Sequence, residues 1–194
     1  LWFASWVRYQ RGEREAAAQS AERLLELATT RGFPTWTDVA HVQRLLSRTD
    51  RLTKESLDAA HRQLASSGLA TAWLRVISLC VLAELYGHAG AAEQGRSMLA
   101  SIGENDRRAF FAADVLRIEG ELIQKSSAPE SGEAERCFRA AIELARKREE
   151  KSLELRASIS LARLWREQGR SAEAHRLLAG IYGWFTEGFD TADL

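Results

Sequence analysis

Proline is nearly absent from this sequence of 194 residues, where it occurs only at Pro34 and Pro129. Runs of β-branched residues are missing as well. Sheets are rich in β-branched residues, and proline interrupts a helix wherever it falls in the interior. Ala, Leu, Glu and Arg dominate instead, and all four are good helix formers. The composition therefore predicts an all-α fold.

Long apolar runs and a charge excess are also missing. The longest apolar stretches, such as residues 79–83, have five residues, whereas a membrane span needs roughly 20. Lys+Arg and Asp+Glu are both 27, so no overall field draws the chain to nucleic acid or to a membrane surface. We therefore expect no nucleic-acid partner and no membrane association.

The start of the chain and its cysteines indicate the setting. The opening "LWFASWVRY" lacks the basic leader and cleavage site of a signal peptide. The chain begins with Leu1, so we expect a segment excised from a longer protein. Cys80 and Cys137 stand alone within apolar helical patterns, which favours buried thiols in a reducing compartment. We expect a cytoplasmic location.

Recognisable chemical motifs are absent. No lysine follows a glycine in the spacing of a phosphate-binding loop, and the four histidines stand far apart. No serine, cysteine or histidine sits in a nucleophile motif. We therefore expect a non-enzymatic segment with no cofactor and no metal.

What is present is a period near forty residues. Gly12, Asp50, Gly90 and Gly169 each follow the first helix of a pair, and a loop near Pro129 fills the remaining interval. A fixed period of paired helices is typical of a solenoid. The sequence predicts a right-handed α-solenoid of about five antiparallel helix pairs similar to tetratricopeptide (TPR) repeats. The predicted units are 1–33, 35–68, 70–103, 108–149 and 151–185, and a capping segment begins within 186–194.

Small residues recur where the helices of one pair should touch. Ala162 and Ala174 flank the turn in the fifth unit, Gly120 is the corresponding residue of the fourth, and Ser5 corresponds in the first. Such residues let two helix axes approach closely. The second unit has Gln43 at this position and is predicted to be the least regular.

Four hydroxyl residues are predicted to cap helix starts. They are Thr35, Thr53, Ser131 and Ser171.

Two segments carry a resemblance to a known family. The run "KSLELRASISLARLW" and the ending "YGWFTEGFDTADL" resemble the C-terminal TPR region of large bacterial signalling proteins. Those proteins carry an adenylate/guanylate cyclase domain, or sometimes a DNA-binding domain, followed by an AAA/STAND-type ATPase. The resemblance implies a regulatory sensor module that acts on the upstream domains of its own polypeptide. The alternative is a structural scaffold that oligomerises or spaces those domains.

A TPR superhelix would place several charged residues of the first helices on its concave face. These candidate partner-binding residues are Arg44, Arg48, Glu84, His88, Arg117, Glu121, Lys125, Arg156, Arg163 and Arg166. One interpretation is a groove for an acidic or extended peptide held by arginine contacts. The other is a solvated surface whose arginines pair with nearby glutamates.

Aromatic residues crowd both ends of the chain. They are Trp2, Phe3, Trp6 and Tyr9 at the start, and Trp184, Phe185 and Phe189 near the end. At the start they predict either packing against an upstream repeat or contact with a second chain, as in a homo-oligomer. Near the end they predict a cover over the last helix pair, or a docking patch for a partner.

Overall fold

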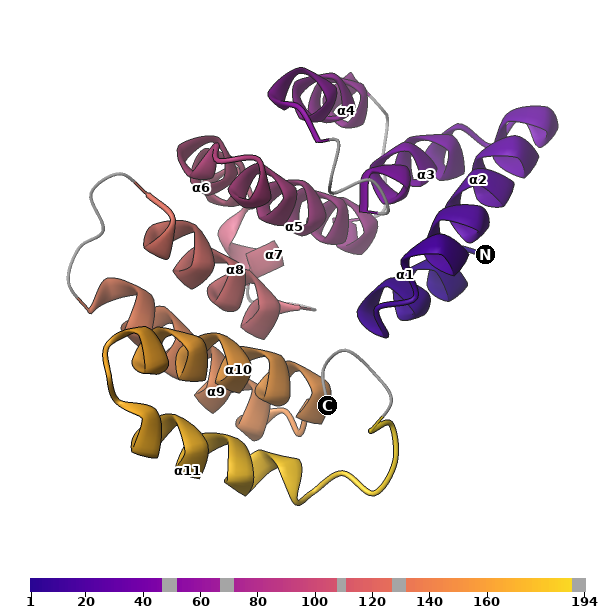
Figure 1. Cartoon of the computed structure of the whole chain (residues 1–194). Coiled ribbons are helices and arrows are strands. Elements are labelled where there is room, and N and C mark those ends of the chain that lie inside the picture. Colours follow the sequence, from indigo (N-terminus) through magenta and orange to yellow (C-terminus); the bar gives the residue numbers. More distant parts are fainter. Residues whose placement is uncertain (47–51, 67–71, 108–110, 127–131, 190–194) are drawn as a thin grey trace. The chain divides into compact units, whose positions relative to one another are not determined.

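The computed structural model describes the chain except for residues 47–51, 67–71, 108–110, 127–131 and 190–194 (Figure 1). The described residues form helices and turns and include no strand, so the predicted all-α class is confirmed. The helices are α1 (Trp2–Gln10), α2 (Arg14–Arg31), α3 (Pro34–Leu46), α4 (Lys54–Ser66), α5 (Ala72–His88), α6 (Ala92–Ala100), α7 (Glu104–Arg107), α8 (Ala112–Gln124), α9 (Glu133–Lys147), α10 (Lys151–Glu167) and α11 (Ser171–Tyr182).

The chain divides into two compact units, Leu1–Asp106 and Arg107–Leu194, called unit 1 and unit 2 below. Each is described by itself. A single solenoid running through all five helix pairs stays a prediction. None of the described helices is both long enough and apolar enough to cross a membrane.

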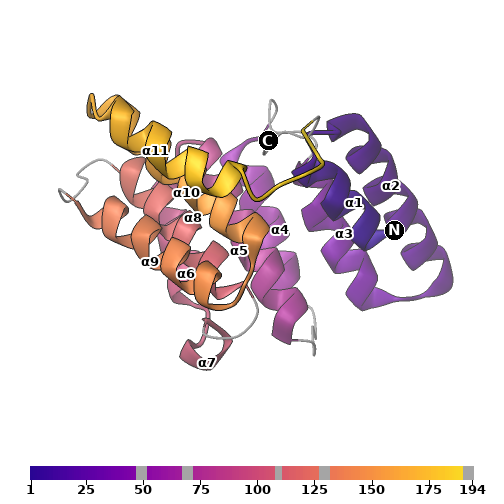
Figure 2. The ribbon, with the colours of Figure 1, turned by 90° about the horizontal axis from the view of Figure 1, so that it is seen from below.

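Unit 1 is organised around α5, which contacts α3, α4 and α6 (Figures 1 and 2). This helix is apolar on almost every side, and a helix of that kind is stable only when it is buried. Accordingly, most of its side chains are buried, and the polar groups among them are the hydroxyls of Ser78 and Tyr86. The helices α2, α3, α4 and α6 each bury apolar residues along one side.

The pair α3–α4 is the most loosely packed of the three pairs in unit 1. Gln43 occupies the position that holds a small residue in the other pairs. It is buried, and its amide donates to the Trp2 carbonyl of α1 at 3.5 Å. The loose packing of α3 against α4 agrees with the irregularity that the sequence predicted for this unit.

Unit 2 is organised around α10, which contacts α8, α9 and α11 (Figure 1). Short connections make each of its four helices antiparallel to the next one. A single apolar cluster fills the space between them. Its buried members are Ile123, Ala134, Phe138, Ala141, Ile142, Ala157, Leu161, Ala162, Leu164, Trp165 and Ala174.

Small residues make the predicted close contacts. The Ser5 hydroxyl of α1 donates to the Ala17 carbonyl of α2 at 2.9 Å. A Cβ atom added to Gly120 of α8 would lie 2.6 Å from Cε1 of Phe138 in α9, closer than two carbons can approach. The pair α8–α9 therefore depends on the missing side chain of this glycine.

Glycine ends the first helix of several pairs, as predicted. Gly12, Gly90 and Gly169 have φ angles of 78°, 73° and 79°, in the left-handed region that favours glycine. After Gly169 the Arg170 amide donates to the Trp165 carbonyl at 2.7 Å, which closes the end of α10. Asp50, which the period also placed at such a turn, lies outside the described residues.

The predicted caps are correct in one case and wrong in two. Thr53 caps α4, because its hydroxyl accepts from the Ser56 amide at 3.3 Å. Thr35 lies inside α3, which starts at Pro34, a residue that suits the first helical position. Ser171 is the first residue of α11, and Arg170 precedes it as the cap without a side-chain hydrogen bond. Ser131 lies outside the described residues.

Candidate functional site

Unit 2 contains an open cleft of about 320 Å³ between α10 and α11. It is called the α10–α11 cleft below. Its lining residues are Ile159, Ala162, Arg163, Arg166, Ser171, Ala174, His175 and Leu178. Two of the predicted partner-binding residues, Arg163 and Arg166, are among them.

Helical spacing explains why these residues share one surface. Side chains three or four positions apart lie on the same side of a helix, and the lining residues of both helices follow that spacing. Ala162 and Ala174 are buried and belong to the apolar cluster of unit 2, so the cleft has an apolar floor. Arg163 and Arg166 are exposed and rise from α10 at its edge.

The polar side chains beside the cleft floor are mostly basic. Within the described part of the chain, neither Arg163 nor Arg166 forms an ion pair or a side-chain hydrogen bond, and the exposed His175 adds a third basic side chain. Arg170, close by, is different. It binds Glu173 at 2.7 Å and Glu135 at 2.9 Å, and hydrogen bonding to Glu173 raises its pKa.

Arg117 was predicted to face a partner, but the structure corrects this. Its side chain is only 4% exposed. Its Nε lies 2.6 Å from an Asp114 oxygen, and its Nη1 lies 2.8 Å from a Glu121 oxygen. Because the two carboxylates are three positions before and four positions after Arg117, one helix supplies all three groups. For this arginine the interpretation of pairing with neighbouring carboxylates is correct.

The buried charges extend from α8 to α10. Arg156 lies 3.5 Å from Asp114, and the Ser160 hydroxyl donates to Glu121 at 2.7 Å. Burial alone would raise the pKa of Asp114, but the attraction of Arg117 and Arg156 outweighs it, so the pKa is lowered. The pKa of Glu121 is lowered against burial in the same way, by Arg117 and by the Ser160 hydrogen bond. These groups are called the α8–α10 charge network below.

The other predicted partner-binding residues do not gather at the cleft. Arg44 of α3 is half-buried, with its Nε 2.9 Å from Glu22 of α2. Glu84 is half-buried and His88 exposed, both on α5. Lys125 is exposed just after α8. Arg48 lies outside the described residues. The candidates are thus divided between the two units, and a continuous groove stays a prediction.

Trp2 was predicted as a docking residue, and the structure corrects this too. It is 4% exposed and packs edge-on against Phe3 and Trp73, with ring centroids 4.8 and 5.8 Å apart. Trp6 and Tyr9 are half-buried beside it. Phe3 remains 64% exposed, so it is the residue of this group that offers a free apolar surface.

Phe3 opens onto an apolar cleft of about 420 Å³ in unit 1. This α1–α3 cleft is lined by Leu1, Trp2, Phe3, Leu24, Leu27, Ala28, Arg31, Phe33 and Trp36. Sequence reasoning missed its second half. The sequence "GFPTW" could have indicated it, because Phe33 and Trp36 lie three positions apart on either side of the first residue of α3.

The C-terminal aromatics contact one another and leave much of their surface exposed. Trp184 meets Phe185 edge-on at 5.1 Å, and Phe189 meets Tyr182 at 5.4 Å. Trp184 is 58% exposed, with the Lys151 ammonium 5.9 Å from its ring centre. The predicted cover over the last helix pair is therefore partial.

His175 and Leu178 were also missed as site residues. The predicted partner-binding residues were all expected on the first helix of each pair, whereas α11 is a second helix and supplies half of the lining residues of the cleft. Leu178 could have been found from Ala174 and His175 from Ser171, because each lies four positions after a residue of the same helix face. Among the described residues, no three His, Cys, Asp or Glu side chains gather closely enough to hold a metal ion.

Comparison of the chain with family models, with curated proteins and with solved structures found no match. The candidate sites are therefore judged on their own geometry.

Proposed function

We propose that this chain is a non-catalytic protein-interaction module that binds an acidic segment of a partner in the α10–α11 cleft. The observation that carries the proposal is the pair of exposed arginines, Arg163 and Arg166, beside an apolar floor. Guanidinium groups without an internal partner are suited to paired contacts with carboxylates. The apolar floor adds the buried area that a surface ion pair alone lacks.

The wider role proposed here follows the resemblance of the sequence. The module would belong to a cytoplasmic bacterial signalling protein linked to a cyclase or an ATPase. Partner binding would then change how the upstream domains of the same polypeptide are arranged.

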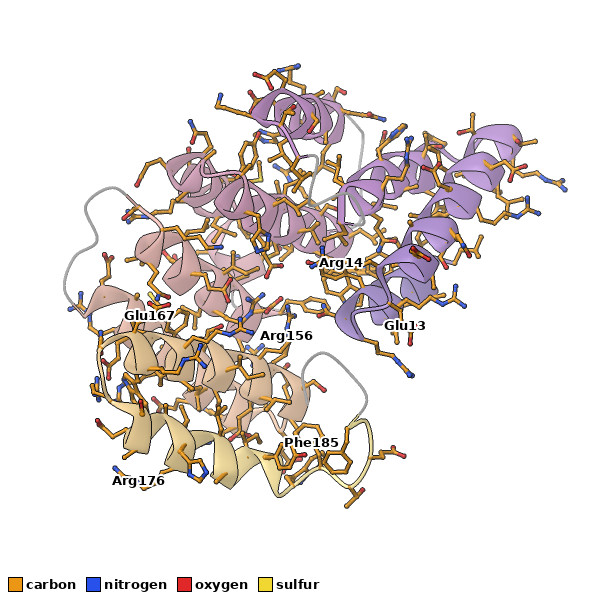
Figure 3. All side chains as sticks on the ribbon, in the orientation of Figure 1. Glu13, Arg14, Arg156, Glu167, Arg176 and Phe185 are labelled. Atoms are coloured by element: carbon orange, nitrogen blue, oxygen red, sulfur yellow. The ribbon has the colours of Figure 1, made fainter. Side chains whose placement is uncertain are left out.

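The proposal is tested with an array of short acidic peptides and three proteins. These are the wild type, the double variant Arg163→Glu/Arg166→Glu and the control Arg176→Glu. Arg176 is exposed on α11, points away from α10 and does not line the cleft (Figure 3). Its substitution changes the charge of the same helix pair without touching the site.

We expect some peptides to bind the wild type, and the double variant to bind them at least about tenfold more weakly. The control should bind as the wild type does, measured by fluorescence anisotropy. If no peptide binds, or if Arg176→Glu weakens binding as much as the double variant, the proposed function is wrong.

Self-association is a second candidate function, favoured by the α1–α3 cleft. Phe3 and Phe33 are 64% and 56% exposed at its edge, and Leu1 is 51% exposed. Apolar surface gathered in this way is typical of a protein–protein contact. A second copy of the chain could bury both aromatic rings and thereby join two sets of upstream domains.

Sedimentation velocity tests this second candidate. The wild type should show a concentration-dependent dimer at micromolar concentrations, and Phe3→Ser/Phe33→Ser should remain monomeric. The control is Trp184→Ser, which removes an aromatic ring of similar exposure from unit 2. A wild-type protein that stays monomeric throughout would rule the candidate out.

A further inference from the structure

The α10–α11 cleft corresponds to the surface of α8 and α9 that α10 covers. Gly120 and Ala162 hold the same place in the repeat pattern of the sequence. Gly120 lies against Phe138 of α9, and Ala162 belongs to the same apolar cluster as Ala174 of α11. Counting from them, Arg163 of α10 corresponds to Glu121 of α8, and Arg166 corresponds to Gln124.

Glu121 and Gln124 both bind the helix that follows. Glu121 accepts a hydrogen bond from the Ser160 hydroxyl of α10 at 2.7 Å. The Gln124 amide donates to the Glu167 carboxylate at 3.0 Å. Arg163 and Arg166 therefore stand where a first helix contacts the next helix in the stack.

The second helices correspond in the same way. Ala174 matches Ala134 and Leu178 matches Phe138, and both residues of α9 pack in the cluster that α10 completes with Leu161. The floor of the cleft thus repeats the apolar floor on which α10 lies.

His175 corresponds to Glu135 of α9. Glu135 lies 2.9 Å from Arg170, which directly precedes α11. The match between the two surfaces therefore extends to a third polar position at the edge of the cleft.

The charges at the three polar positions differ between the two surfaces. The α8–α9 surface carries a glutamate, a glutamine and a glutamate, and it binds Ser160, Glu167 and Arg170. The α10–α11 cleft carries two arginines and a histidine in their place. A helix seated there would need anionic groups where the α10 segment has those three residues.

We infer that the cleft binds one amphipathic helix of a partner protein, carrying an acidic stripe beside a narrow apolar stripe. This inference rests on the proposed function and adds the form of the ligand. The helix lies across α10 and α11 as α10 lies across α8 and α9. Its carboxylates fall about two turns apart, as Ser160 and Glu167 do on α10. Its apolar stripe repeats the small and medium-sized residues Ala157 and Leu161.

The test uses two synthetic peptides copied from residues 151–170 and held helical by a side-chain lactam on the outer face. The acidic peptide carries Ser160→Glu and Arg170→Glu and keeps Glu167. The neutral peptide carries Gln at those three positions. Both include Arg156→Gln, so that the peptide presents no cation to Arg156 of the protein.

The acidic peptide should bind the full-length chain at least about tenfold more tightly than the neutral peptide, measured by anisotropy. The protein variant Arg163→Glu/Arg166→Glu should lose this preference, and Arg176→Glu should keep it. A third peptide with Lys at positions 160 and 167 should bind the double variant better than it binds the wild type. Chemical-shift changes on titration should fall on α10 and α11.

The remaining outcomes separate the inference from the proposed function. If an acidic peptide broken by Leu161→Pro binds as well as the helical one, the helical mode is wrong and the binding function stands. If array peptides bind through Arg163 and Arg166 but the helical peptide does not, the inference is again wrong. If neither the array peptides nor the helical peptide binds, the inference and the proposed function are both wrong. Self-association that the double variant abolishes would assign the cleft to a second copy and overturn the inference.

Discussion

Unit 1 and unit 2 can be compared through one helix each that contacts three others, and these two helices bury different chemistry. In unit 1 this helix is α5, whose buried side chains are apolar except for the hydroxyls of Ser78 and Tyr86. In unit 2 it is α10, which buries Glu154, Ser158 and Ser160 among its apolar residues. Both arrangements form a helical core, so the two units differ mainly in the polar and charged groups that their central contacts bury.

The difference lies in how precisely each contact fixes the position of a helix. Apolar side chains tolerate sliding and repacking, whereas a buried ion pair is favourable only at short distance and good geometry. The α8–α10 charge network joins two helices through Asp114 and Glu121, and Glu154 joins the end of α9 to α10 through Arg146. We infer that unit 2 has one strongly preferred register, while unit 1 tolerates adjustment, most of all at α3–α4.

The largest expected effect comes from breaking the charge network. Asp114→Ala leaves Arg117 and Arg156 without their shared carboxylate, and removing one partner of a buried pair costs about 3–5 kcal/mol. Hydrogen exchange followed by mass spectrometry should show the loss of protection in unit 2. The control is Glu26→Ala in unit 1, whose ion pair with Arg23 is exposed and should contribute nothing measurable. Equal losses of protection in the two units would contradict the comparison.

Two glycine substitutions within unit 2 should have opposite signs. Gly120→Ala places a methyl group against the Phe138 ring and should destabilise by about 1–3 kcal/mol despite the better helix propensity of alanine. Gly180→Ala in α11 meets open space and should stabilise by about 0.5–1 kcal/mol. Urea unfolding measures both. If both variants are stabilised, α8 and α9 are not in the close contact described here.

Acid should affect unit 2 through carboxylates of lowered pKa. Burial opposes the charged forms of Asp114, Glu121 and Glu154, but neighbouring cations lower the pKa of each. Because these folded-state pKa values lie below the unfolded ones, the stabilisation is present above roughly pH 4.5 and is lost as the pH falls further. A pKa that is lower by one in the folded state than in the unfolded state corresponds to on the order of 1 kcal/mol of folding free energy.

We therefore expect unit 2 to lose exchange protection progressively below about pH 4.5. Asp114→Asn should weaken this dependence, since one of the three titrating carboxylates is gone and Glu121 and Glu154 remain. A pH dependence identical to that of the wild type would show that Asp114 contributes no linked stability.

The smallest expected effect is local to unit 1. The Tyr86 hydroxyl of α5 donates to Asp58 of α4, and burial together with this carboxylate raises the pKa of Tyr86, so that it remains a donor. Tyr86→Phe removes a link of the loosely packed α4. Amide exchange in α4 should become a few-fold faster, while exchange in α6 should not change. Faster exchange throughout unit 1 would indicate that α4 is no looser than its neighbours.

The sequence predicted the helical architecture well because its signals are local. Turn glycines such as Gly169 and the small contact residue Gly120 act within one helix pair, and their spacing is visible in the chain. The cap predicted at Thr35 is two residues too late, because α3 begins at Pro34, a good first helical residue, and Phe33 precedes it.

The site was predicted only in part, because charge pairing depends on three-dimensional neighbours. Helical spacing placed Arg117 on the same surface as Arg163, yet one is buried between two carboxylates and the other is exposed at a cleft. Each arginine has a glutamate four positions later, Glu121 in one case and Glu167 in the other, but the two glutamates bind different partners. Glu121 turns inward to Arg117, while Glu167 is bound by Gln124.

The α8–α10 charge network also constrains how this sequence can change over generations. Asp114 serves two guanidinium groups, and Glu121 serves Arg117 and Ser160 at once. A single replacement leaves at least one buried charge without its partner. Replacing the network by uncharged residues without loss of stability therefore requires several substitutions together. Descendants of this chain should therefore retain the whole set together or have exchanged the whole set for hydrocarbon side chains, and intermediates should be scarce.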